Sequence, residues 1–320
     1  MTSYLLDRHG HAKTAIERDE IESRLENGDF FWLDLHAPTE ADFQLLRDVF
    51  GFHSLAVEDA EHFGQRAKIE PYENFYFLVF YGVAPPPDED RLVELHCFFS
   101  DHFLVTVRRD EAPACDALRE RYERQGALAE PIRLLYQIVD ELVDSFFPAL
   151  ADLDDEIDAL QDSILADPSD EQLQRIFELR RRLSRMRTVV SQERDLAQRW
   201  VGGAPDLPHL SPEGEHYLRD VHDHLVRLSE RIDGYRELLA GAMDTYFSAA
   251  QRRLNTVVKQ LTVVAAIFLP LSFITGFFGQ NFGWLVRHVG GWPEFVFLGL
   301  GLQLFAIALM VVYFTRRGWF

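Results

Sequence analysis

The stretch Pro270-Leu-Ser-Phe-Ile-Thr-Gly-Phe-Phe-Gly-Gln-Asn281 lies at the outer end of the first of two closely spaced apolar segments. The first segment runs from Leu261 to Phe278, and the second runs from Phe295 to Phe314 and is apolar apart from Gln303. Each has about 20 residues, the length needed to span a hydrocarbon core of roughly 30 Å. We therefore predict two membrane helices joined by a short loop. A pair of buried helices in a soluble core is the alternative.

Basic residues indicate how this hairpin is oriented. Five of them lie before the first segment or after the second: Arg252, Arg253, Lys259, Arg316 and Arg317. The loop between the segments has only Arg287. Because basic residues favour the cytoplasmic side, we expect both termini to be cytoplasmic and the protein to lie in the inner or cell membrane. The N-terminus shows no apolar run typical of a secretion signal. Cys97 and Cys115 form no spaced metal motif and fit a reducing compartment.

Charge is divided unevenly along the chain. From residue 251 onward there are six basic residues and one acidic residue, a net of +5, so the whole-chain charge of −20 leaves −25 for residues 1–250. An acidic soluble part argues against nucleic acid as a partner, since phosphate binding requires a basic surface. It suits a domain that concentrates cations, although solubility alone explains most of these carboxylates.

The soluble part shows two kinds of pattern. Aromatic and β-branched runs predict strands, and short amphipathic runs predict helices between them: strands at Phe30–Leu35, Phe75–Val83, Leu92–Phe99 and Phe103–Val107, helices at Thr39–Phe50 and Ser54–Glu61. Further on, apolar residues three and four apart predict long helices over Ile132–Leu165 and Asp170–Trp200. Glu213 to Phe278 has no proline before Pro270 and predicts one helix of about 100 Å.

The expected fold is an α+β membrane protein. An N-terminal mixed α/β cytoplasmic domain is followed by a long helical stalk that continues into a two-helix transmembrane hairpin. The predicted parts are the α/β domain (1–130), a helical pair (131–212), the stalk and first transmembrane helix (213–279, with the membrane part from about 257), the outer loop (280–293), the second transmembrane helix (294–315) and a tail (316–320).

One face of the first membrane helix is small and partly polar. Its members step by three and four residues: Asn255, Val258, Thr262, Ala265, Leu269, Ser272 and Gly276. Small residues also serve close packing between membrane helices, so the stripe alone does not separate packing from a pore. Two helices from one copy cannot enclose a water-filled path, so conduction would require several copies around an axis.

Several motifs then resemble the CorA family of divalent-cation channels, which have two membrane helices and a Gly-Met-Asn signature. They are Val57-Glu-Asp59, Gln65-Arg-Ala-Lys-Ile-Glu-Pro-Tyr72, Asp154-Asp-Glu-Ile-Asp158, Tyr217-Leu-Arg-Asp-Val-His-Asp-His224, Asn255-Thr-Val-Val-Lys-Gln-Leu-Thr262, Ile267-Phe-Leu-Pro-Leu-Ser-Phe-Ile-Thr-Gly276 and Val312-Tyr-Phe with Trp319. The resemblance spans nearly the whole chain. It implies a homopentamer with a pore lined by the first membrane helix, Mg²⁺ as substrate and regulatory ligand, and no organic cofactor.

The signature itself departs from the family, since this chain has Gly279-Gln280-Asn281. We expect these residues to form the selectivity filter. Gly279 would end the helix in a left-handed conformation, and a ring of Asn281 amide oxygens would accept from the waters of Mg²⁺, which loses its shell reluctantly. The loop has Arg287 and His288 with Glu294 as its one acidic residue, which weakens the attraction of a dication.

Apolar rings at Val258, Leu261 and Leu269 would close such a pore by dewetting. The resemblance also implies regulatory Mg²⁺ between subunits, held by Asp59 and Asp220 with Glu58 and Asp223 as neighbours. We interpreted His222 and His224 as surface residues, since positions two apart on a helix point to different faces.

Three functions remain open. The first is a Mg²⁺ channel that also carries Co²⁺ or Ni²⁺. The second is a Zn²⁺ transporter coupled to protons, similar to the ZntB branch of the family. The third is a membrane-anchored helical scaffold that conducts nothing. The sequence has no nucleotide-binding loop, no HExxH motif and no nucleophile constellation, so we do not expect an enzyme.

Overall fold

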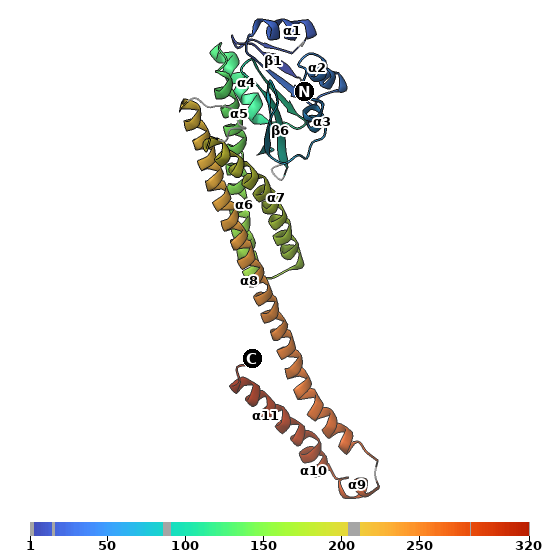
Figure 1. Cartoon of the computed structure of the whole chain (residues 1–320). Coiled ribbons are helices and arrows are strands. Elements are labelled where there is room, and N and C mark those ends of the chain that lie inside the picture. The colour runs from blue at the N-terminus through green and yellow to red at the C-terminus, as the bar shows by residue number, and fades with distance from the viewer. Residues whose placement is uncertain (1–2, 15–16, 86–90, 204–211, 282, 320) are drawn as a thin grey trace. The chain divides into compact units, whose positions relative to one another are not determined.

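The computed structural model describes residues 3–14, 17–85, 91–203, 212–281 and 283–319 (Figure 1). Phe282 of the predicted outer loop and Phe320 of the predicted tail lie outside the described residues. The chain divides into two compact units, one made of Met1–Ser163 with Ser169–Met243 and the other of Ile164–Pro168 with Asp244–Phe320.

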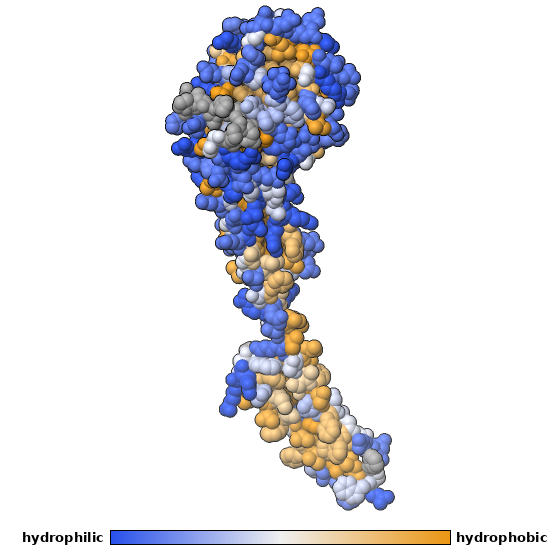
Figure 2. All heavy atoms as spheres, viewed as in Figure 1, coloured by the Kyte–Doolittle hydropathy of each residue, from blue (hydrophilic) through white to orange (hydrophobic). Residues whose placement is uncertain are grey.

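The second unit carries the apolar helices. Helix α8 (Pro212–Phe278) ends here, and α9 (Gly283–His288), α10 (Trp292–Glu294), the π-helix η1 (Phe295–Gly301) and α11 (Leu302–Arg316) follow. Within the described part, two helices are long and apolar enough to cross a membrane, Gly214–Phe278 and Trp292–Arg316, and their most apolar stretches are almost entirely exposed. Figure 2 shows apolar residues covering the C-terminal part of α8 and the helical segment that follows it. Exposed apolar surface of this length is what a lipid-facing helix requires.

The first unit is built on a sheet. Among the described residues it has seven strands in the order β2-β1-β3-β7-β6-β5-β4, with β3 and β7 parallel and the other pairs antiparallel. The strands are β1 (Tyr4–Leu6), β2 (Ala12–Lys13), β3 (Phe31–His36), β4 (Lys68–Pro71), β5 (Tyr76–Val83), β6 (Leu92–Phe99) and β7 (Phe103–Arg108). The helices around the sheet are α1 (Arg18–Asn27), α2 (Glu40–Asp48), α3 (Ser54–Glu61) and α4 (Pro113–Gln125).

A buried ion pair joins the two parallel strands at the centre of this sheet. Arg108 Nε donates to Asp34 Oδ2 at 3.0 Å, and both side chains are almost completely buried. Thr106 donates to the other carboxylate oxygen of Asp34 and accepts from Trp32 Nε1 at 3.0 Å. Because every one of these polar groups has a partner, the network holds β3 in register with β7.

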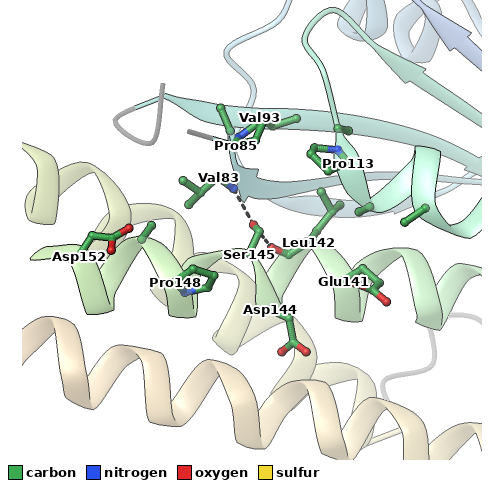
Figure 3. Close-up of a pocket in the computed structure, with 15 residues that line it drawn as sticks. Val83, Pro85, Val93, Pro113, Glu141, Leu142, Asp144, Ser145, Pro148 and Asp152 are labelled. Carbon is green, nitrogen blue, oxygen red and sulfur yellow. Dashed lines mark hydrogen bonds between the residues drawn. The ribbon is translucent and has the colours of Figure 1, made fainter. Parts of the chain in front are cut away.

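The helix predicted over 132–165 is interrupted at Ser145, between α5 (Pro131–Asp144) and α6 (Phe146–Ala166). Ser145 Oγ accepts from the Val83 backbone N–H at 2.8 Å and donates to the Leu142 carbonyl at 2.5 Å (Figure 3). Pro148, which has no backbone N–H, follows in the first turn of α6. The break is therefore fixed by a hydrogen bond to β5, and a cavity of 430 Å³ lies beside it.

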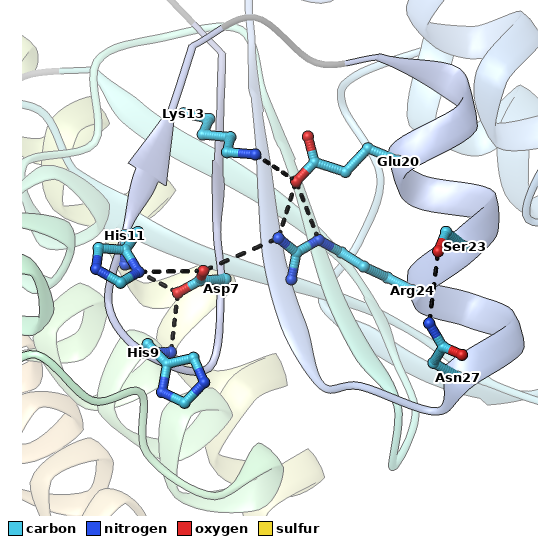
Figure 4. Close-up of polar contacts among 8 residues, drawn as sticks. All are labelled: Asp7, His9, His11, Lys13, Glu20, Ser23, Arg24 and Asn27. Atoms are coloured by element: carbon cyan, nitrogen blue, oxygen red, sulfur yellow. Dashed lines mark hydrogen bonds and ion pairs between the residues drawn. The ribbon is translucent and has the colours of Figure 1, made fainter.

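Polar contacts hold the turn between β1 and β2 at one edge of the sheet (Figure 4). Asp7 Oδ1 accepts from the backbone N–H groups of His9 and His11 at 2.8 and 2.9 Å. Burial of the Asp7 carboxyl group raises its pKa, but the hydrogen bonds from His11 and His9 outweigh burial, and the pKa of Asp7 is lowered. Arg24 on α1 reaches the same carboxylate at 3.9 Å, so the edge hairpin is tied to the first helix.

Helix α7 (Asp170–Val201) attaches the helical part to the sheet by two side chains. Gln192 Oε1 accepts from the Ala67 backbone N–H at 3.2 Å, and Glu193 Oε1 accepts from the Tyr81 backbone N–H at 2.6 Å. Tyr81 lies beyond Val79, where the pairing of β4 with β5 ends, so this N–H would otherwise lack an acceptor. Glu193 is 1% exposed, and its Oε2 has no hydrogen-bond partner among the described residues.

Replacing Glu193 with Gln should remove a pH dependence of stability. Burial raises the pKa of Glu193 from 4.5 to about 8, although the Tyr81 N–H lowers it in part. A folded-state pKa above the unfolded one means that stability is full below pH 4.5 and is lost as the pH rises through about 8. The loss is at most about 5 kcal/mol. Thermal unfolding of the detergent-solubilised protein, followed by tryptophan fluorescence, should show a midpoint that falls with pH in the parent.

The Glu193→Gln variant should show a much flatter pH profile, because its amide still accepts from Tyr81 but does not ionise. Glu237→Gln is the control, since Glu237 is an exposed carboxylate on α8. Parallel pH profiles in the parent and in Glu193→Gln would contradict the prediction.

Candidate functional site

The predicted filter lies where α8 ends. Gly279 N donates to Thr275 O at 2.9 Å and Gln280 N donates to Phe277 O at 3.3 Å, which completes the last turn of the helix. Gln280 and Asn281 follow as exposed residues. Asn281 is therefore exposed just beyond the end of the apolar helix.

Gly279 was expected to end the helix in a left-handed conformation, and that expectation was wrong. Gly279 is not in the left-handed conformation. A Cβ at this position would lie 2.9 Å from the Thr275 carbonyl oxygen. Glycine is needed because the chain passes so close to the backbone of the preceding turn.

The predicted pore-lining stripe is uncovered in the single chain. The seven residues of the stripe and Leu261, the other predicted pore-lining residue, are all exposed: Asn255, Val258, Leu261, Thr262, Ala265, Leu269, Ser272 and Gly276. The second membrane helix and the residues after it bind other positions of α8. Gln303 Nε2 donates to Thr275 Oγ1 at 3.0 Å, and Lys259 Nζ donates to the carbonyl of Gly318, beyond the end of α11, at 2.9 Å. The one polar residue of the second segment thus binds the first helix and leaves the stripe free.

Two threonine hydroxyl groups on this helix donate hydrogen bonds to backbone carbonyls of the preceding turn. Thr262 Oγ1 donates to the Val258 carbonyl at 2.7 Å, and Thr275 Oγ1 donates to the Leu271 carbonyl at 2.9 Å. Hydroxyl groups bonded in this way are tolerated in an apolar environment.

Asp59 lies on α3 and is paired within its own chain. Its Oδ2 accepts from Lys68 Nζ at 2.5 Å, and Lys68 also donates to Glu70 at 2.9 Å. Partial burial lowers the pKa of Lys68, but the bonds to Asp59 and Glu70 outweigh it and the pKa is raised. The predicted regulatory carboxylate is therefore partly neutralised by a lysine that the sequence analysis did not single out.

Asp220 lies on α8 beside a group of polar residues from α5. Tyr136 Oη donates to Asp220 Oδ2 at 3.3 Å, and His224 Nε2 lies 3.8 Å from Asp220 Oδ1. His224 Nδ1 lies 2.9 Å from Asp144 Oδ1 and 3.7 Å from Asp140 Oδ1. Ligand atoms of Asp140, Asp144 and His224 are all within 4.8 Å of one another, as a metal ion requires.

Burial and the neighbouring Asp144 raise the pKa of Asp140 to about 6, while His224 opposes this. Asp140 Oδ1 is buried and has no hydrogen-bond partner among the described residues. Two carboxylates and an imidazole with an orphaned oxygen fit a divalent cation. The interpretation of His224 as a plain surface residue was wrong. The signal that could have found this group is the i, i+4 spacing of Asp140 and Asp144 on a predicted helix.

The remaining predicted regulatory residues are more exposed. Asp223 is 66% exposed, and its Oδ1 lies 3.5 Å from His222 Nδ1. The side chain of Glu58 is exposed on α3. No hydrogen bond or ion pair joins Asp59 to Asp220 in the described part of the chain. Their predicted pairing is between subunits, which one chain does not test.

Comparison with known proteins identifies the family. The profile described as "CorA-like Mg2+ transporter protein" matches residues 27–317, which is most of the chain. The chain belongs to the CorA family. Its members are membrane transporters of divalent cations, so the predicted family and the prediction of transport rather than enzymatic catalysis are confirmed.

Relatives agree along nearly the whole length. A putative metal ion transporter of Bacillus subtilis, YfjQ, is 32% identical over 93% of this chain and 92% of its own. The cobalt/magnesium transport protein CorA of Thermotoga maritima is 30% identical over 90% of this chain and 83% of its own. The complete structure of the CorA magnesium transporter from Methanocaldococcus jannaschii superposes with a TM-score of 0.83 at 22% identity, covering 100% and 99% of the two chains. The predicted CorA-type fold class is confirmed.

Proposed function

We propose that this chain is one subunit of a homopentameric channel for Mg²⁺, with Co²⁺ and Ni²⁺ as accompanying substrates, in the inner or cell membrane with both termini in the cytoplasm. The observation that carries the proposal is the uncovered stripe of α8 leading to the exposed amides of Gln280 and Asn281. A scaffold that conducts nothing gives no reason for this arrangement. Two relatives are cobalt/magnesium transport proteins, which supports the choice of Mg²⁺ and Co²⁺.

In this proposal Asn281 side chains from five copies form a ring that accepts from the water shell of Mg²⁺, with Gly279 and Gln280 shaping the entrance. The ion then passes Ser272 and the apolar rings of Leu269 and Leu261, which close the path by dewetting. The membrane potential supplies about 2.3 kcal/mol per charge per 100 mV, so about twice that for a dication. No covalent step and no organic cofactor are needed.

Regulation is assigned to carboxylates of the first unit. Asp59 and Asp220, with Glu58 and Asp223 beside them, would hold Mg²⁺ between neighbouring subunits. Asp140, Asp144 and His224 lie next to Asp220 and add further ligands to the same region. Bound cations would neutralise these acids and hold the subunits together, and loss of the cations would let like charges push them apart.

Uptake into liposomes distinguishes the proposed function from its alternative. The purified chain should admit Mg²⁺ at a rate that follows the membrane potential and is insensitive to a pH gradient. Zn²⁺ uptake that requires a pH gradient, without Mg²⁺ uptake, would favour the proton-coupled Zn²⁺ transporter. Empty liposomes are the control, and the absence of any dication uptake would contradict both.

A further inference from the structure

A polar pocket of 390 Å³ lies within the first unit, at the carboxyl ends of the two parallel strands. His36 ends β3 and Arg108 ends β7, and the two residues are partners in the register of these strands. Tyr4 of β1 and Arg119 of α4 also line the pocket. Ligands of α/β proteins commonly bind at this edge of a sheet, because connections that leave the strands in different directions open a crevice there.

One buried side chain of this pocket lacks a partner. His36 is 8% exposed, and its Nε2 atom has no hydrogen-bond partner among the described residues. A buried polar atom without a partner is energetically costly, so a ligand or an ordered water is expected to complete it. Burial and the neighbouring Arg108 lower the pKa of His36, so its imidazole is neutral at pH 7. A neutral imidazole can present either an N–H or a lone pair at Nε2, so the other groups of the pocket decide the charge of the ligand.

The backbone directly after His36 is strained. Ala37 has a φ of 50°, and among the described residues it is the one non-glycine residue with a positive φ. Its N–H donates to the Arg108 carbonyl at 2.8 Å, which fixes this conformation between the two strand ends. Strained residues persist where the surrounding structure holds them, and they cluster at ligand sites. The strain therefore marks the same strand end as the unpartnered imidazole.

The two guanidinium groups of the pocket are already paired. Arg108 donates to Asp34 Oδ2 at 3.0 Å and to Asp116 Oδ1 at 2.8 Å. Arg119 Nη1 donates to Glu123 Oε1 at 3.0 Å. Each guanidinium thus has a carboxylate as its counter-ion, which leaves little attraction for an anionic ligand.

Negative charge is in excess in the lining. Three carboxylates face two guanidinium groups, a net of −1: Glu111, Asp116 and Glu123 against Arg108 and Arg119. Glu111 is exposed and forms no ion pair within the described part of the chain. A ligand with N–H donors and a positive charge satisfies both this carboxylate and the imidazole nitrogen. A metal ion does not fit, because the described side chains of this pocket form no group of three metal ligands within 4.8 Å of one another.

We propose that the pocket at the ends of β3 and β7 binds a small organic ammonium ion, which donates to His36 Nε2 and is attracted by Glu111 and Asp116. The volume of 390 Å³ corresponds to about thirteen waters at roughly 30 Å³ each, which is enough for an aliphatic amine of a few carbons. The site includes neither the membrane helices nor the predicted regulatory carboxylates, so its test is independent of the proposed channel.

Isothermal titration calorimetry of the full-length protein in detergent tests this site, with putrescine as the probe. Saturating Mg²⁺ is present throughout, so that carboxylates that bind divalent cations are already occupied. Putrescine should bind once per chain and raise the midpoint of thermal unfolding. Succinate, the dicarboxylate of the same chain length, should not bind. The absence of putrescine binding would overturn the proposal, and binding of succinate in its place would do the same by assigning an anion site.

His36→Phe should weaken putrescine binding at least about tenfold, the loss of a hydrogen bond to a charged group. Its thermal stability without ligand should not fall, because the phenyl ring removes a buried polar atom that has no partner. Glu111→Gln should weaken binding about threefold to fivefold, as expected for an exposed charge. Glu120→Gln, at an exposed position of α4 outside the pocket, is the matched control and should bind as the parent does.

Equal putrescine affinity in the parent and in His36→Phe would overturn the proposal. Equal affinity in Glu111→Gln and Glu120→Gln would also overturn it, and this second comparison decides even where His36→Phe does not fold.

Discussion

Replacing Asn281 with Ala is expected to reduce dication uptake at least about fiftyfold. In a ring of five copies the change removes five amide acceptors at once. Each hydrogen bond contributes roughly 0.5–1.5 kcal/mol, so even the lower value gives about 2.5 kcal/mol for the ring. Asn281 lies outside the last turn of α8 and is exposed. Its truncation should therefore leave the fold unchanged, and the loss should appear in transport alone.

The matched variant is Gln280→Met at the adjacent position. It restores the residue of the family signature and should keep or increase Mg²⁺ uptake. Native mass measurement in detergent should give a homopentamer for the parent and both variants. Unchanged uptake in Asn281→Ala would show that the amide ring is not the filter. A stable dimer would contradict the pore itself.

The elements that are strongly patterned along the chain were predictable. Strands near Phe75–Val83 and Leu92–Phe99, the long helix that ends at Phe278 and the apolar segment after Phe295 all appear where their sequence patterns placed them. Hydrophobic length and periodicity determine such elements locally. The short strands β1, β2 and β4, which include both edges of the sheet, were missed because two to four residues carry too little pattern.

Features that depend on a distant partner were not predictable. The break at Ser145 exists because Val83 presents a free N–H, and apolar spacing runs through it unchanged. Burial of Glu193 follows from the Tyr81 N–H at the end of the β4 pairing. The carboxylate of Glu294 lies against the Gly291 backbone because glycine has no side chain to displace it. In each case residues far apart in the sequence, or a missing side chain, decide the position.

The candidate regulatory site contains residues that the sequence indicated and residues that it did not. Resemblance indicated Asp59 and Asp220, but Lys68 and the group of Asp140, Asp144 and His224 emerged only from the packing of α3 on β4 and of α5 on α8. Lys68 is shared between Asp59 and Glu70 and so balances part of their negative charge. Under the proposed regulation, more of the negative charge that bound cations would neutralise lies on the Asp220 side.

The double change Asp59→Asn, Asp220→Asn should weaken closure of the channel by cytoplasmic Mg²⁺. It keeps the shape of both side chains and removes two negative charges per subunit, so the Mg²⁺ concentration that half-closes the channel should rise about tenfold or more. Millimolar Mg²⁺ should also protect the variant less from proteolysis, because the same bound ions would cause closure and protection.

The control for that change is Asp158→Asn, Asp162→Asn on α6, which removes the same charge from two exposed positions and should behave as the parent. Because the control alters net charge equally, a difference between the two double variants isolates specific binding from general electrostatic repulsion.

The structure also predicts that the two single variants differ in effect. Asp59→Asn leaves Lys68 with Glu70 as its remaining partner and should raise the half-closing concentration less than Asp220→Asn, which removes a carboxylate that no Lys or Arg of the described residues pairs. Equal protection by Mg²⁺ in the parent and both double variants would show that Asp59 and Asp220 are ordinary surface acids, and that any sensor must be sought around Asp140, Asp144 and His224.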